Sequence, residues 1–135
     1  MEKSQKVGAQ IYGYTICLVA VITFLISITT LVNAVIDLED PIHAGWTQPG
    51  SPSLASFENY KMDLLKTSKQ GDETNQPSYV PDDATLRAMY QAAKDDKIQS
   101  VRHQSHRSII IDCILIVISF ALFITHWRWM KKITA

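Results

Sequence analysis

The polar side chains best placed for chemistry lie within a long apolar stretch near the C-terminus. Asp112, Ser119 and His126 recur every seven residues, so they share one face of a helix. An ionisable group inside a membrane-crossing stretch is a candidate functional site, because it normally faces protein or water. Three roles are open for Asp112: a hydrogen bond to Asn33 or Thr30, solvation at the membrane interface, or a proton or ion pathway. We favour the hydrogen bond.

Three histidines form a second candidate. His103 and His106 are three residues apart and therefore share a helix face. With His43 they could hold a metal ion near the membrane surface. No cysteine or second acidic ligand has a matching spacing, so we interpret the histidines as solvated and expect no metal and no other cofactor.

Small residues mark one face of an apolar stretch near the N-terminus. They recur at seven-residue intervals, with further small side chains on the same side: Gly13, Cys17, Ala20, Thr23, Ser27, Thr30 and Ala34. Small side chains let helix backbones approach closely within lipid. The pattern predicts a face that packs against another helix.

Catalytic motifs are missing from the sequence. It holds no glycine-rich phosphate loop, nucleophile elbow, HExxH or CxxC. Its acidic residues occur as neighbour pairs, which point in different directions on a helix. Lys+Arg 13 balance Asp+Glu 13, which argues against nucleic-acid binding. We therefore expect neither an enzyme nor a nucleic-acid-binding protein.

Two apolar stretches predict membrane spans. Residues 11–36 carry no Asp, Glu, Lys or Arg, and residues 108–127 carry Asp112 alone of these types. About 20 apolar residues cross ~30 Å of hydrocarbon, and helix is the form that satisfies their backbone. A secretory signal is the alternative for the first stretch, but its apolar run is about twice the usual length. We favour a retained span.

Basic residues near the spans predict the topology. The terminal side has Lys3, Lys6, Arg128, Lys131 and Lys132, and the connecting side has Lys94, Lys97, Arg102 and Arg107. The small surplus predicts that the tails 1–10 and 128–135 are cytoplasmic. The connector 37–107 would then be periplasmic or lumenal.

The connector itself is expected to be partly helical. A short helix is predicted over residues 53–66, started by Ser51-Pro52. Residues 68–81 have no periodicity and are interpreted as a mobile loop. From about residue 82, capped by Asp82 or Asp83, the chain has no glycine or proline, so one long amphipathic helix continues into the second span.

The predicted fold is an all-α membrane protein, an antiparallel two-helix hairpin with a small extracytoplasmic helical cap. Such a cap is too small to be stable alone, and no catalytic set accompanies it. We therefore expect a non-catalytic accessory subunit, held by other membrane subunits and by lipid. We lean towards an energy-transducing respiratory or photosynthetic complex. The alternatives are a sensor or adaptor, or a proton- or ion-coupled subunit that uses Asp112.

Overall fold

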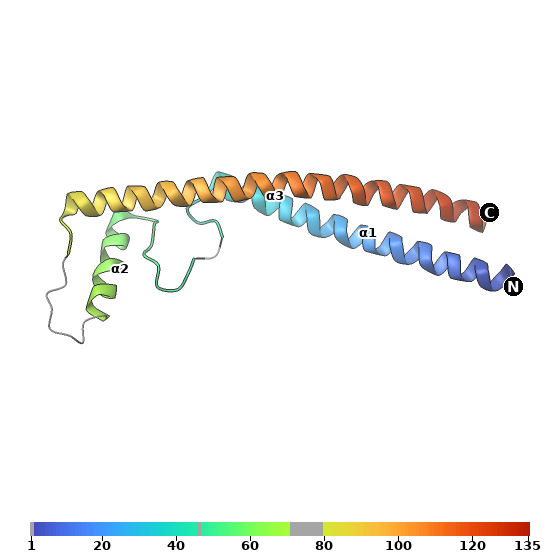
Figure 1. Cartoon of the computed structure of the whole chain (residues 1–135), viewed down its shortest axis with the longest axis horizontal. Helices are drawn as coiled ribbons and strands as arrows, with labels where there is room; N and C mark the ends of the chain where they lie inside the picture. Colours follow the sequence, from blue (N-terminus) through green and yellow to red (C-terminus); the bar gives the residue numbers. More distant parts are fainter. Residues whose placement is uncertain (1, 46, 71–79) are drawn as a thin grey trace. The chain divides into compact units, whose positions relative to one another are not determined.

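The computed structural model describes residues 2–45, 47–70 and 80–135, and every regular element in them is a helix (Figure 1). These are α1 (Glu2–Glu39), α2 (Phe57–Gln70) and α3 (Asp83–Thr134). The all-α prediction is thus confirmed for the described residues. The chain divides into a first unit, Met1–Val35 with His106–Ala135, and a second unit, Ile36–Ser105. The predicted mobile loop falls mostly on residues 71–79, which lie outside the described residues.

Helix α1 is longer than the predicted span 11–36. It already begins at Glu2, so most of the predicted N-terminal tail is helical. It ends at Glu39, and the Asp40 N–H still donates to the Ile36 carbonyl at 3.1 Å. Pro41 follows, and the residue before a proline disfavours helical geometry. The apolar stretch is therefore the central part of a helix whose ends are polar.

Helix α3 runs without a break from Asp83 to Thr134. Asp82 caps its start: the Leu86 N–H donates to the Asp82 carbonyl at 2.9 Å, and the Thr85 hydroxyl donates to the Asp82 carboxylate. Of the two candidate caps, the structure selects Asp82. The predicted C-terminal tail is helical through Thr134. Residues 83–105 belong to the second unit and residues 106–134 to the first.

The apolar parts of α1 and α3 are mostly exposed. Both helices are long and apolar enough to cross a membrane, yet only 17% of the most apolar stretch of α1 and 11% of that of α3 is buried. The core helix of a soluble protein would be mostly buried. A large exposed apolar surface instead marks contact with lipid or with other protein. The pair is compatible with the predicted hairpin.

Helix α2 starts four residues later than the predicted start at 53. Its cap is Ser56, whose Oγ accepts the Asn59 N–H at 3.2 Å, and the predicted start at Ser51-Pro52 is wrong. The Ser53 N–H instead donates to the Asp63 carboxylate at 3.0 Å. This bond ties the loop before α2 to the side chain of Asp63 on α2.

Tyrosines pack α2 against the start of α3 in the second unit. Tyr60 on α2 and Tyr90 on α3 are both buried, with ring centroids 5.5 Å apart. Phe57 meets Tyr90 edge-on at 5.9 Å. The Tyr90 hydroxyl donates to the Leu54 carbonyl at 3.1 Å, which ties the loop before α2 to α3. Leu86, at 2% exposure, completes this small core.

An ion pair across this core gives the second unit a pH dependence. Lys61 Nζ lies 2.7 Å from Asp83 Oδ1. The hydrogen bond and the attraction between the charges raise the pKa of Lys61 above 10.5 and lower that of Asp83 below 3.8. The contribution of Asp83 to the stability of the second unit is therefore full above pH 3.8 and is lost as the pH falls through its lowered pKa. The contribution of Lys61 to stability is full below pH 10.5 and is lost as the pH rises through its raised pKa.

We expect acid to loosen the packing of α2 on α3 by a modest amount, because Asp83 is exposed, Lys61 is only half-buried, and solvent screens the pair. Near-UV circular dichroism of the tyrosines in detergent measures this loss. Asp83→Asn cannot titrate and is expected to lack the acid transition. An identical acid titration of the two proteins would contradict the assignment.

Candidate functional site

Two stripes of small and polar side chains line the inside of the first unit. There α1 and the C-terminal part of α3 run antiparallel, with both chain ends at the same end of the pair (Figure 1). The buried members are Gly13, Cys17, Ala20, Ser27 and Ala34 on α1 and Asp112, Ser119 and Met130 on α3. Thr23 and His126 are half-buried at the edges, and Thr30 is exposed. Seven-residue spacing on both helices keeps the stripes in register.

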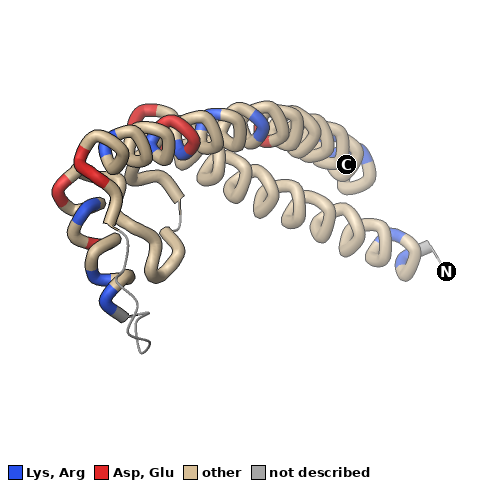
Figure 2. The backbone as a smooth tube through the Cα atoms, turned by 60° about the vertical axis from the view of Figure 1, so that its left-hand side comes forward, with Lys and Arg blue, Asp and Glu red and all other residues tan. Residues whose placement is uncertain are grey.

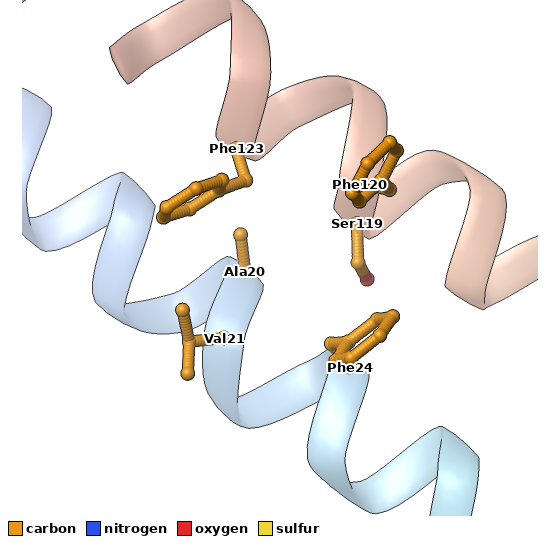
Figure 3. A pocket seen from close by; sticks show the side chains of 6 residues that line it. All are labelled: Ala20, Val21, Phe24, Ser119, Phe120 and Phe123. Atoms are coloured by element: carbon orange, nitrogen blue, oxygen red, sulfur yellow. The ribbon is translucent and has the colours of Figure 1, made fainter.

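Gly13 lies directly against the side chain of Met130 on α3. A Cβ added there would lie 2.7 Å from Met130 Sδ and 2.8 Å from Met130 Cγ. Further along, Ala20 and Ser119 lie between the helices (Figure 3). The small-residue face therefore packs against α3 of the same chain. Any other subunit would therefore have to bind surfaces other than this small-residue face of α1.

Asp112 is buried in this inner stripe, and one of its carboxylate oxygens has no hydrogen-bond partner among the described residues. It is 6% exposed, and within the described part of the chain no group bonds its Oδ2. The predicted bond to Asn33 or Thr30 is wrong. Asn33 is exposed, because it precedes buried Ala34 and so lies about 100° round α1 from the stripe. The Thr30 hydroxyl donates to carbonyls of its own helix at 3.1 and 3.2 Å.

The structure does not gather the three histidines into one cluster within the described residues. Among the described residues no group of three or more His, Cys, Asp or Glu side chains could hold a metal ion. His43 Nδ1 lies 2.8 Å from Asp40 Oδ2, and both side chains are largely exposed. His103 and His106 are exposed on α3. Their interpretation as solvated side chains remains a prediction.

His126 lies at the edge of the inner stripe, near the chain ends. Its Nδ1–H donates to the Leu122 carbonyl at 3.0 Å, since a carbonyl can only accept. Its ring centroid is 6.4 Å from that of Tyr12 on α1. This pairing across two helices depends on the register between them, which the spacing of residues along one helix does not give.

An apolar groove follows the middle of the helix pair. It has a volume of about 220 Å³ and is lined by Ala20, Val21, Phe24, Ser119, Phe120 and Phe123 (Figure 3). The three phenylalanines were not singled out from the sequence. Phe120 and Phe123 are three residues apart and so share a side of α3, but only the position of α1 brings Phe24 to them.

The geometry of the first unit is that of a helix-packing site. It joins two helices, holds a buried carboxylate with one oxygen that no described group bonds, and leaves the outer apolar faces exposed. Comparison with known protein families, with curated proteins and with solved structures gave no match. The functional argument therefore rests on the packing face, the buried acid and the exposed surfaces.

Proposed function

We propose that this protein is a non-catalytic accessory subunit of a larger integral membrane complex, inserted as a two-span hairpin. The observation that carries the proposal is the exposure of the apolar parts of α1 and α3, of which 17% and 11% is buried. Because the two helices contact each other along narrow stripes of small residues, most of each helix surface is free for lipid or for other helices. Within lipid, helices associate by close packing.

Both chain ends lie on the cytoplasmic side in this proposal. Antiparallel packing brings the termini to one end of the first unit (Figure 2), and five basic residues lie there: Lys3, Lys6, Arg128, Lys131 and Lys132. A surplus of basic residues favours the cytoplasmic side. The second unit would then be periplasmic or lumenal, and its outer surfaces would contact other subunits of the complex.

Native electrophoresis of a tagged chain from its own organism, in mild detergent, tests this function. We expect a discrete large band, and mass spectrometry of that band should find partner subunits in fixed proportion. We lean towards partners from an energy-transducing respiratory or photosynthetic assembly. A monomer or dimer band without partners would contradict the proposal.

A second candidate function follows from Asp112. A buried carboxylate oxygen without a partner is energetically costly, and such groups within membranes often serve proton or ion transfer. The protein would then be an ion-coupled subunit. Asp112→Asn distinguishes the two: lost transport with an intact complex supports ion coupling, whereas an intact complex with normal transport supports the accessory role.

A further inference from the structure

The end of the first unit where the termini meet is strongly basic. Segments 1–10 and 125–135 hold the five basic residues named above, against one acidic residue, Glu2. Figure 2 shows these cations at the start of α1 and at the end of α3. None of the five forms an ion pair with a carboxylate among the described residues. Their charge is available to an anionic ligand.

A groove opens between α1 and α3 at this basic end. It has a volume of about 360 Å³ and is lined by Tyr12, Thr125, His126 and Trp129. Tyr12 and Trp129 are 59% and 42% exposed, so their rings present both apolar surface and a polar group. Gly8 lies one turn before Tyr12 and has no neighbour within 4 Å of an added Cβ. The space beside α1 is therefore open from Tyr12 towards the N-terminus.

Two of the five cations lie on α3 beside residues at the edge of the groove. Arg128 follows Thr125 by three residues, and Lys132 follows Trp129 by three and Arg128 by four. Residues spaced in this way are neighbours on one helix face. Lys3 and Lys6 lie elsewhere: they are about a half turn and a third of a turn round α1 from Tyr12. The same end of the unit thus holds cations beside the groove and cations away from it.

We propose that this groove binds one anionic phospholipid, with the phosphate at Arg128 and Lys132 and the glycerol and upper acyl chains between Tyr12 and Trp129. The charge selects an acidic headgroup, because basic residues next to a membrane attract anionic lipids. The aromatic walls fit the boundary between headgroups and hydrocarbon, where tyrosine and tryptophan gather. The proposal rests on the membrane insertion in the proposed function, but not on the presence of partner subunits.

Native mass spectrometry of the full chain in mild detergent tests the site. Phosphatidylglycerol and phosphatidylcholine with the same acyl chains are added in parallel, and we expect retention of phosphatidylglycerol. The double variant R128Q/K132Q should weaken its binding by about 30-fold, from the usual contribution of a basic residue to anionic lipid binding. The matched control K3Q/K6Q removes the same charge at the same end and should weaken binding far less.

A second variant fills the groove without changing any charge. Thr125→Trp should also abolish retention of phosphatidylglycerol, and circular dichroism checks that all variants keep the helix content of the parent chain. Equal losses of phosphatidylglycerol binding in R128Q/K132Q and K3Q/K6Q would overturn the proposal and indicate a diffuse charged surface instead of a site in the groove. Equal retention of both lipids, or displacement of phosphatidylglycerol by inorganic phosphate, would also overturn it. Because the chain is assayed in detergent without partners, these outcomes are separate from the native-gel result.

Discussion

Replacing Gly13 with leucine is expected to destabilise the contact between α1 and α3 by about 1–3 kcal/mol, the usual cost of overpacking. A Cβ at this position would already lie 2.7 Å from Met130 Sδ. Met130 is flexible and can yield to one methyl group, so Gly13→Ala should cost much less. A leucine needs more room than one side chain can release, and the helices must move apart.

Gly8→Leu is the matched control, because an added Cβ at Gly8 has no neighbour within 4 Å. Titration of the purified chain from mild detergent into dodecyl sulfate measures helix separation. Tryptophan fluorescence reports the separation of the helices directly, since Trp129 Cζ3 lies 3.7 Å from the position of a Cβ added at Gly13. Equal midpoints for Gly13→Leu and Gly8→Leu would show that the helices do not pack in this register.

Replacing Asp112 with serine is expected to stabilise the isolated helix pair by about 1–3 kcal/mol, the cost of an unsatisfied buried polar group. Asp112 is 6% exposed, and its Oδ2 has no partner among the described residues. Serine is a small residue that both stripes already contain, as Ser119 on α3 and Ser27 on α1. Its hydroxyl can bond the carbonyl four residues earlier, as the Thr125 hydroxyl does with Ala121 at 2.8 Å.

The same dodecyl sulfate titration measures this gain. Asp95→Ser is the control, because Asp95 is exposed on the same helix and its replacement should shift stability by less than about 0.5 kcal/mol. A loss of stability in Asp112→Ser would show that the carboxylate makes a favourable interaction in the folded pair. That result would remove the observation on which the ion-coupled function rests.

Much of the fold could be predicted because two long apolar stretches, neither of them interrupted by proline, leave the chain few choices. The two long helices follow from composition, and the start of α3 follows from Asp82, which offers a cap just after Pro81. The start of α2 could not be predicted in this way. Ser51, Ser53 and Ser56 are all possible caps, and the choice depends on the bond between Ser53 and Asp63 across ten residues.

The inner stripe of the candidate site could also be predicted in part. Seven-residue spacing identified Gly13, Ala20 and Ser27 as a packing face, and burial agrees with that spacing. The partner of each residue could not be predicted, because it depends on the register between α1 and α3. The expected bond of Asp112 to Asn33 or Thr30 is absent among the described residues, because Asn33 lies about 100° round α1 from the stripe and the Thr30 hydroxyl bonds its own helix.

Labelling of single cysteines tests the central claim, that α1 and α3 cross a membrane as a hairpin. Native Cys17 and Cys113 are replaced by alanine, and one cysteine is placed at exposed Gly8 or at exposed Ser51. With a maleimide that cannot cross membranes, we predict that Ser51→Cys is labelled in intact cells. Gly8→Cys should be labelled only after the membrane is opened. Labelling of both from the same side, or recovery of the chain in the soluble fraction, would contradict the account.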